Sequence, residues 1–302
     1  VGDASFMQSL GGKGANQAVA AARLGGSVIF VTSLGNDMYA DILKKNFEKE
    51  GITTDYIIND NQHPTGTALI FVADSGENCI AVAPGANYSL SPESINHFSK
   101  VIDETEIVVM QAEIPYNTIK SIALLAQQKG KKILFNPAPA CLIDAELMKA
   151  IDILVVNEVE AAFVSGIKHT GDNLEEIAEA LITAGAQNVV ITLGSHGVYM
   201  KNAYTSGRLP SYKVNAIDTI AAGDTFCGAL AVMCAQKEID IEALKFANAA
   251  AAIAVTRSGA QPSIPTLEEV NHFILKNELP YRSTSKFNEH ENLLEPTIHS
   301  IR

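Results

Sequence analysis

An aspartate in the last third of the chain follows a run of small residues and precedes a helix-forming stretch. Ala221, Ala222 and Gly223 come directly before Asp224 within DTIAAGDTFCGAL, residues 218–230. Small residues at a helix N-terminus allow backbone N–H groups to bind anionic oxygens. Because a carboxylate there would repel a phosphate, we expect Asp224 to accept a proton from a substrate hydroxyl while the N–H groups hold a transferring phosphoryl group. The residues alone leave a second interpretation open, in which Asp224 caps the helix.

The second candidate feature is the glycine-rich turn GGKGAN at residues 11–16, which runs into strong helix formers. Such a turn indicates backbone that passes close to a ligand. It is not a Walker A loop, since Gly14 stands where Ser or Thr would follow Lys13, and it is not G-x-G-x-x-G, since Gln17 holds the last glycine position. Lys13 and Asn16 can offer donors to hydroxyls, although a plain glycine turn with a solvated lysine fits the local residues equally well.

Val/Ile runs alternate with helical patterns, which predicts a mostly parallel sheet with helices on both faces, a Rossmann-like α/β fold. The predicted strands are residues 27–32, 106–111, 131–135, 151–156 and 188–192, and the predicted helices are 37–50, from 91 onward, 115–129, 172–184, 241–256 and 266–275. Ligands of such sheets bind beyond the carboxyl ends of the strands. We therefore expect six residues that follow strands to gather along that edge: Glu113, Asn136, Asn157, Glu160, Thr192 and Gly194.

Residues 65–83 break this alternation. Two apolar runs flank the turn-forming sequence DSGEN, which predicts a hairpin. We expect residues 66–83, with 1–10, to form a small β lid on an α/β domain made of 11–65 and 84–275, and 276–302 to be a disordered tail. The apolar faces of the hairpin have no partner in the α/β pattern, so we expect them to close on the ligand site or on a second subunit, giving a homodimer through the lid.

The composition of the 302-residue chain is that of a folded protein, with 47% hydrophobic and 19% charged residues. The net charge of −12 argues against nucleic acid or an anionic membrane as the main partner. The sequence contains no apolar run of about 18 residues and no leader pattern, so we expect a cytoplasmic protein, or a nuclear one as well in a eukaryote. The four cysteines form no C-x-x-C pair and are predicted to be buried free thiols, and no His pattern predicts a structural zinc site.

Two long segments, GGKGANQAVAAARLG at 11–25 and DTIAAGDTFCGAL at 218–230, resemble the two signatures of the ribokinase-type carbohydrate kinases. The likeness continues through TGTALIF, NPAPA, VVNEVEA, ITLGSHGV and AAAIAVTRSGAQPS, from residue 1 to about residue 270. The resemblance implies a ribokinase-like fold and ATP-dependent phosphorylation of D-ribose to D-ribose 5-phosphate. A kinase for another sugar or a nucleoside, and a non-catalytic sugar- or nucleotide-binding protein, remain alternatives.

By position, the resemblance implies a role for each part of the site. Asp224 would be the base for the hydroxyl at carbon 5, beside an anion hole formed by the backbone of Ala221, Ala222 and Gly223. The sugar would be bound by Gly12, Lys13, Gly14, Ala15, Asn16, Glu113 and Asp224. ATP and its Mg²⁺ would lie against Asn157, Glu160, Thr192, Leu193, Gly194, Ser195, His196, Gly197, Gly223, Asp224 and Asn248. A K⁺ ion would be held, partly through carbonyl oxygens, by Asp218, Ile220, Ala254, Arg257, Gly259 and Ser263.

The resemblance also places one further inner strand, ending in Asn-x-Asp, before Val1. We therefore expect the chain as printed to bind ATP analogues better than ribose, to phosphorylate ribose weakly, and to be hard to keep soluble.

Overall fold

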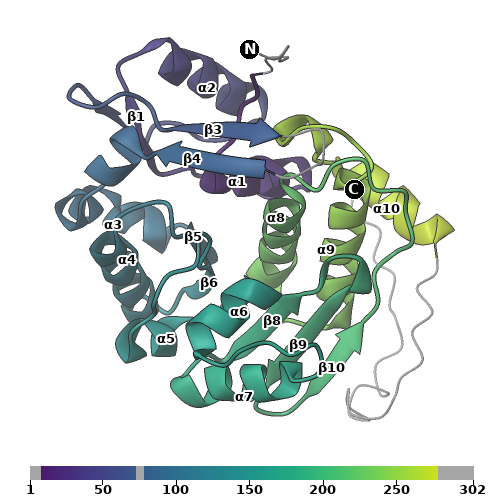
Figure 1. Cartoon of the computed structure of the whole chain (residues 1–302). Coiled ribbons are helices and arrows are strands. Elements are labelled where there is room, and N and C mark those ends of the chain that lie inside the picture. Colours follow the sequence, from purple (N-terminus) through teal and green to yellow (C-terminus); the bar gives the residue numbers. More distant parts are fainter. Residues whose placement is uncertain (1–7, 73–77, 278–302) are drawn as a thin grey trace.

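The computed structural model describes residues 8–72 and 78–277. Within them, the largest sheet has six strands in the order β10-β9-β8-β7-β6-β5, seen in Figure 1. Strands β5 to β8 are parallel, and β9 and β10 are antiparallel additions at one edge. Their bounds are β5 Ile107–Gln111, β6 Lys132–Asn136, β7 Ile153–Asn157, β8 Asn188–Thr192, β9 Val198–Asn202 and β10 Ser206–Leu209. The predicted mostly parallel α/β sheet is confirmed.

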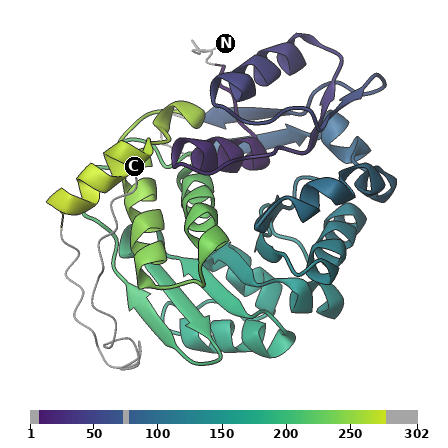
Figure 2. The ribbon, with the colours of Figure 1, turned by 180° about the vertical axis from the view of Figure 1, so that it is seen from behind.

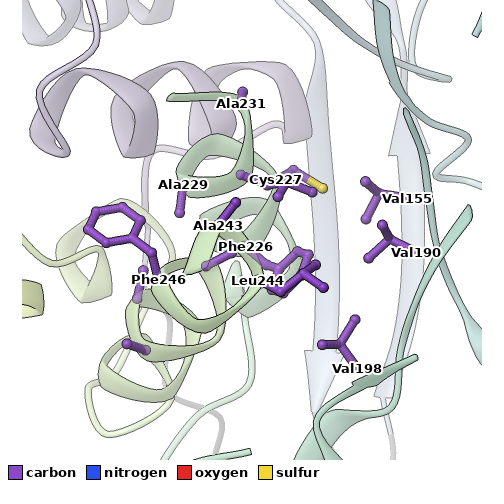
Figure 3. Close-up of a cluster of buried hydrophobic side chains, with 14 of the residues drawn as sticks. Val155, Val190, Val198, Phe226, Cys227, Ala229, Ala231, Ala243, Leu244 and Phe246 are labelled. Carbon is purple, nitrogen blue, oxygen red and sulfur yellow. The ribbon is translucent and has the colours of Figure 1, made fainter. Parts of the chain in front are cut away.

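Helices cover both faces of this sheet because successive side chains of a strand point to opposite faces. In β7, Ile153 and Val155 pack in one apolar cluster with α8 and α9, whereas Leu154 and Val156 pack in another with α4, α5 and α7. Figure 3 shows Val155 pointing toward α8 and α9. The helix bounds are α4 Tyr116–Gln128, α5 Ala145–Ala150, α6 Glu158–Ser165, α7 Leu174–Ala184, α8 Ala222–Gln236 and α9 Ile241–Ala254.

The first helix, α1 Lys13–Arg23, lies directly against α8 in both views (Figures 1 and 2). Gly228 is the reason that the two helices approach so closely. A Cβ atom at this position would lie 2.6 Å from the Cβ atom of Ala20 and 2.7 Å from the carbonyl oxygen of Gln17. The close approach brings the first turns of α1 to the N-terminal end of α8.

The remaining elements pack around α1 and the edge of the molecule. An apolar cluster that includes Val19, Phe47 and Ile264 joins α1 to α2 and to the segment before α10. A parallel pair, β1 and β2, forms its own two-stranded sheet, and β3 pairs with β4 as an antiparallel hairpin. The bounds are β1 Thr32–Gly35, α2 Met38–Lys49, β2 Ile57–Asp60, β3 Thr67–Val72, β4 Asn78–Ala83, α3 Ile95–Asp103 and α10 Leu267–Lys276.

The hairpin predicted between residues 65 and 83 is therefore present, although its turn at 73–77 lies outside the described residues. The rest of the expected lid at residues 1–7, and the expected tail from 278 to 302, also lie outside them. No helix in the described ranges is long and apolar enough to cross a membrane.

One local prediction was wrong. The strand expected at 27–32 is displaced: Ile29 makes only an isolated bridge with Thr53, and the paired strand is Thr32–Gly35. The apolar residues 27–32 indicated extended backbone near the right place, but β2 pairs with residues 32–35. The helix expected from residue 91 onward is present: the 3₁₀ turn Pro92–Ser94 leads directly into α3, which starts at Ile95.

The cysteines are free where the structure describes their side chains. Cys227 and Cys234 are buried as predicted, and Cys141 is only half-buried. The side chain of Cys79 lies outside the described set.

Candidate active site

Asp224 occupies the third position of α8, which begins at Ala222. The residue in the N-cap position is Ala221, with φ 59° and ψ 9°, the single left-handed non-glycine residue in the described ranges. Such a conformation costs about 1–3 kcal/mol and is often found at functional sites. Among the described residues, no side chain caps this helix. The interpretation of Asp224 as an N-cap is therefore wrong, because the backbone turns into the helix at Ala221 and the carboxylate is used elsewhere.

The first turn of α8 presents backbone N–H groups. The amide and the hydroxyl of Thr225 both donate to the carbonyl oxygen of Ala221 at 2.8 Å, and the amide of Ala222 donates to Thr219 at 3.3 Å. The next two amides, of Gly223 and Asp224, have no acceptor within the helix because of its geometry. Gly223 is exposed and Asp224 is buried. This end of α8 therefore combines N–H donors at the surface with a buried carboxylate.

Both oxygens of the Asp224 carboxylate accept hydrogen bonds from side-chain amides of α1. Asn16 Nδ2 donates to Oδ2 at 2.8 Å, and Gln17 Nε2 donates to Oδ1 at 3.1 Å. Burial raises the pKa of Asp224, and the two hydrogen bonds and the charge of Lys13 oppose that rise. A buried carboxylate with a raised pKa is a suitable proton acceptor near neutral pH.

Gln17 continues this network toward the sheet. Its Nε2 also donates to Asn136 Oδ1 at 3.2 Å, and its Oε1 accepts from Gln111 Nε2 at 2.7 Å. Asn136 Nδ2 in turn donates to the carbonyl oxygen of Val155 at 2.8 Å. Sequence reasoning missed Gln17 and Gln111. The available signals were a polar residue within a run of small apolar ones at residues 15–22, and a glutamine at the end of the predicted strand 106–111.

The glycine-rich turn meets the end of β5. Gly12 precedes α1 with φ 94°, a value that favours glycine, and the Lys13 amide donates to Glu113 Oε2 at 2.8 Å. A Cβ atom on Gly14 would lie 2.9 Å from Gln111 Oε1, so the turn and the strand end are in contact. Burial raises the pKa of Glu113, and the nearby charge of Asp224 adds to the rise. Of the predicted sugar-binding residues, hydrogen bonds join Lys13 to Glu113 and Asn16 to Asp224. Gly12, Gly14 and the buried Ala15 lie in the same turn and first turn of α1.

The six residues predicted to share one sheet edge do so. Gln111 at the end of β5 is in register with Asn136, and Asn157 at the end of β7 is in register with Thr192. Asn157 and Glu160 form a capping box at the start of α6, in which Oδ1 of Asn157 accepts from the Glu160 amide at 2.8 Å and Oε2 of Glu160 accepts from the Asn157 amide at 2.9 Å. Burial raises the pKa of Glu160, and the charge of Lys13 opposes it.

The predicted nucleotide segment continues after β8 as the 3₁₀ turn Gly194–His196, closed by a 2.8 Å bond from the Leu193 amide to the Gly197 carbonyl. Gly194, Ser195 and His196 are exposed, whereas the Leu193 side chain is buried and leaves only its backbone for a ligand. A Cβ atom on Gly197 would lie 2.0 Å from the Leu209 carbonyl oxygen. Asn248 on α9 donates to the next carbonyl, of Pro210, at 3.1 Å. Asn248 is thus tied to the segment that also contacts Gly197.

The residues predicted to hold a cation lie in two loops that Asp218 joins. Its Oδ1 accepts from the Ile220 amide at 2.9 Å, and its Oδ2 accepts from the Gly259 amide at 2.8 Å. The amides of Ile217 and Asp218 both donate to the Val255 carbonyl oxygen. The loop before α8 and the segment after α9 therefore lie side by side.

In three further predicted cation ligands, the side chain is apolar or already bonded to another residue. Ala254 is fully buried, the Arg257 guanidinium pairs with Glu269 at 2.5 Å, and the Ser263 hydroxyl donates to the Ala260 carbonyl at 2.7 Å. The described residues contain no group of three or more His, Cys, Asp or Glu side chains that could hold a metal ion. One carboxylate with several carbonyl oxygens fits a weakly hydrated monovalent cation, for which carbonyl cages are known ligands.

Comparisons with known proteins agree with this geometry. The family model of the pfkB family carbohydrate kinases matches residues 3–267. The chain is 40% identical over 271 residues to a ribokinase of Haemophilus influenzae, covering 89% of each chain. It is 35% identical over 277 residues to a deoxyribokinase of Salmonella typhi, covering 91% of this chain and 90% of the relative.

Solved structures agree in fold. The crystal structure of a ribokinase from Thermotoga maritima matches with a TM-score of 0.80 and 42% identity, covering 88% of each chain. That of an Arabidopsis thaliana ribokinase, complexed with ribose and ATP, matches with a TM-score of 0.83 and 29% identity, covering 90% of this chain and 88% of the other. With the matched family model, these likenesses establish that the chain belongs to the pfkB family of carbohydrate kinases.

Proposed function

We propose that this protein transfers the γ-phosphoryl group of ATP to the 5-hydroxyl of D-ribose, giving D-ribose 5-phosphate. The observation that carries the proposal is the buried Asp224 carboxylate, held by two amides at the uncapped N-terminus of α8. Ribokinases are among the relatives with the same fold, and one of them is complexed with ribose and ATP.

The sugar side is built to bind hydroxyl groups. Asn16 is 5% exposed, and its Oδ1 atom is buried without a hydrogen-bond partner among the described residues. A buried unpaired acceptor costs free energy unless a ligand donor satisfies it, and a sugar hydroxyl supplies such a donor. Glu113 and Lys13 lie beside it and offer an acceptor and donors to further hydroxyls. In this proposal, Asn16 binds the sugar through Oδ1 while its Nδ2 atom holds Asp224.

In the chemical step, Asp224 accepts the proton of the attacking hydroxyl as its oxygen bonds to the γ-phosphorus. The bond from the γ-phosphorus to the β,γ-bridging oxygen breaks, and ADP leaves. The amides at the start of α8 and the positive end of the helix dipole stabilise the charge on the phosphoryl oxygens. Phosphoryl transfer requires mainly this positioning and neutralisation of charge. Binding of the sugar hydroxyl beside Asp224 excludes water from the acceptor position.

The nucleotide would lie along the strand ends. Asn157, Glu160, Thr192 and the backbone of the turn Gly194–His196 provide polar groups there, and Gly194 leaves space for a ligand because nothing lies within 4 Å of a Cβ atom added to it. Glu160 and Asn157 offer the oxygen ligands that Mg²⁺ prefers. When bound, Mg²⁺ neutralises charge on the phosphates of ATP.

A K⁺ ion would be held by Asp218 and carbonyl oxygens of the loops that it joins. These residues fit the ion as argued above, and the loop 217–220 leads directly into the first turn of α8. When bound, the ion adds positive charge beside the phosphoryl site and holds the loop in place.

The hairpin β3–β4 would act as a lid over the sugar and as a dimer contact. Leu69 and Phe71, on one face of the hairpin, are 55% and 66% exposed, and Val82 on the other face is 60% exposed. An exposed apolar hairpin of this kind favours burial against ligand or a second subunit.

The test is turnover of a substrate panel, D-ribose, 2-deoxy-D-ribose, D-fructose and adenosine, followed by ADP release. We expect D-ribose to give the highest kcat/KM. The deoxyribokinase of Salmonella typhi supports 2-deoxy-D-ribose as the second candidate substrate. A higher kcat/KM with 2-deoxy-D-ribose than with D-ribose would make it the preferred substrate. A third outcome is that the folded protein, identified by its melting transition, binds sugar and ATP in calorimetry but releases no ADP. That result would favour a non-catalytic binding protein.

A further inference from the structure

The Gln17 side chain is hydrogen-bonded to the proposed base, Asp224, but none of the roles assigned so far uses it. It is 2% exposed and hydrogen-bonds with Asp224, Asn136 and Gln111. These partners come from α8, β6 and β5, so one side chain of α1 connects the base to the ends of two strands. The residues proposed to bind sugar, nucleotide and cation do not include it.

The orientation of the Gln17 amide is fixed by its neighbours. The carbonyl oxygen of Val155 can only accept, so Asn136 must direct its Nδ2 donor there and its Oδ1 acceptor toward Gln17. Gln17 must then direct its NH₂ group at two oxygens, those of Asn136 and Asp224, and its own Oε1 atom at Gln111. A flipped Gln17 amide would place oxygen against oxygen at two of these contacts.

We propose that Gln17 is a positioning residue that holds the Asp224 carboxylate in the orientation needed to accept the proton of the acceptor hydroxyl, and that Asn136 and Gln111 fix Gln17 in turn. The inference rests on the proposed function, because that function makes Asp224 the base. Asn16 holds Oδ2 and Gln17 holds Oδ1, so the two donors together prevent rotation of the carboxylate. Asn16 is expected to engage the sugar as well, whereas Gln17 donates to Asp224 and Asn136 and has no proposed contact with substrate.

The Gln17 bond also favours the ionised carboxylate, since a donor stabilises the charged form. The other titratable groups that face Asp224 are Lys13 on α1, Glu113 after β5, Glu160 on α6 and the Cys227 thiol on α8. Substitution of Gln17 leaves all four in place. A change in the titration of Asp224 would therefore report the lost hydrogen bond.

The experiment compares Gln17→Leu with the parent and with Val19→Ala. Leucine has a similar volume and no donor. Val19 is fully buried in the same helix within the cluster that joins α1 to α2, so its truncation tests loss of packing alone. For Gln17→Leu we expect kcat on ribose to fall by about 10- to 100-fold with KM for ATP changed by less than about twofold. The acid limb of its kcat–pH profile should move up by about one pH unit.

One further variant and the Val19→Ala control sharpen the result. Gln111→Leu frees the Gln17 amide without removing it, so it should shift the acid limb in the same direction by a smaller amount. Val19→Ala should lower the melting temperature and leave the acid limb at the parent pH. The proposal is overturned if the acid limb of Gln17→Leu stays at the parent value, or if kcat falls no more than in Val19→Ala.

A direct titration separates this proposal from the proposed function. The Asp224 carboxyl carbon can be followed by ¹³C NMR and assigned from the signal lost in Asp224→Asn. An upward shift of its titration midpoint in Gln17→Leu supports the hydrogen-bond role even if the substrate panel gives no turnover, and an unchanged midpoint rejects it. Absence of turnover by the parent protein bears on the proposed function and leaves this titration unaffected.

Discussion

At Asp224, burial and hydrogen bonding act on the carboxyl pKa in opposite directions. Burial raises it because the charged form loses solvation, and the amides of Asn16 and Gln17 limit the rise. A group with a raised pKa in the folded state binds its proton more tightly there than in the unfolded chain. Stability is therefore greatest where the group is protonated in both states, and it is lost as pH rises through the folded pKa.

We expect Asp224→Asn to reduce kcat on ribose by about 10²–10⁴-fold, the usual range for a positioned general base. Binding of ATP should remain close to that of the parent protein. The melting temperature at neutral pH should be equal or higher, because a neutral amide avoids the cost of a buried charge and Asn16 can turn its Oδ1 atom toward the new NH₂ group. Turnover, calorimetry and thermal unfolding measure the three quantities. A variant with parent-like kcat would end the assignment of Asp224 as base.

The kcat of the parent protein should decline as pH falls, since a protonated Asp224 cannot accept a proton. Because burial raises the pKa of this carboxyl, the decline should lie above the ordinary aspartate value of about 3.9. A kcat–pH profile with saturating ribose and ATP measures this limb, and stability measured at each pH serves as the control. A profile that is flat down to about pH 4 would contradict a base of raised pKa.

At the scale of elements, the site depends on the close contact between α1 and α8. Glycine at 228 permits this contact, and the first two turns of α1 then supply both amides that hold Asp224. Asp218 ties the loop before α8 to the segment after α9. Because this loop leads into the first turn of α8, both α8 and α9 help to position the amides of the proposed anion hole.

Gly228→Ala should push α1 away from α8, because the added methyl group would lie 2.6 Å from the Cβ atom of Ala20. We expect a loss of about 1–3 kcal/mol in the free energy of unfolding, typical of overpacking, and a lower kcat as Asn16 and Gln17 move from the carboxylate. The double variant with Ala20→Gly removes the nearest clash and should recover part of both losses. Urea unfolding and turnover test this, and a single variant with parent values of both would disprove the role of the glycine.

Asp218→Ala should abolish activation by potassium. The carboxylate bonds to the amides of Ile220 and Gly259, so its loss separates the two loops and removes the charged ligand of the proposed cation. For the parent we expect KCl, and NaCl far less, to raise both kcat and the melting temperature. Thermal shift in KCl and NaCl gives a readout independent of activity. Equal effects of the two salts on the parent protein would count against a selective K⁺ site.

At the scale of the whole molecule, the hairpin β3–β4 is a small separate sheet beside α1, as Figure 1 shows. The chain just before β3 is anchored to α2: the Thr65 amide and hydroxyl donate to the Asp37 carboxylate, which also caps α2. These hydrogen bonds fix the position from which the hairpin and its exposed apolar side chains extend.

Phe71→Ser should weaken a dimer formed through the hairpin, because it removes a 66% exposed aromatic ring from the proposed contact. Tyr204→Ser is the matched control, since Tyr204 is 87% exposed but lies between β9 and β10. Light scattering across a concentration series should show a dimer for the parent and the control, and a monomer for Phe71→Ser. A parent protein that stays monomeric, or a Phe71→Ser dimer as stable as the parent, would refute this contact.

Much of the architecture followed from local patterns in the sequence. Alternation of Val/Ile runs with helix formers identified the parallel sheet, since a strand buried on both faces requires continuous apolar residues. Parallel strands end at one edge, so Asn157 and Thr192 could be placed together before any contact was known. The order of motifs around Gly12 and Asp224 likewise indicated the family, because those residue types are needed locally for close backbone approach and for proton transfer.

The tertiary structure alone decided how these residues are used. Whether Asp224 caps its helix or faces a ligand depends on the conformation of Ala221 and on donors from another helix, and Gln17 lies 207 residues away in the chain. The direction of the Gln17 amide follows from a backbone carbonyl in β7, which no local pattern encodes. The pairing of residues 32–35 in place of 27–32 also depended on the partner strand. Local sequence determines which residues can form an element or donate a proton, whereas long-range packing determines which of them meet.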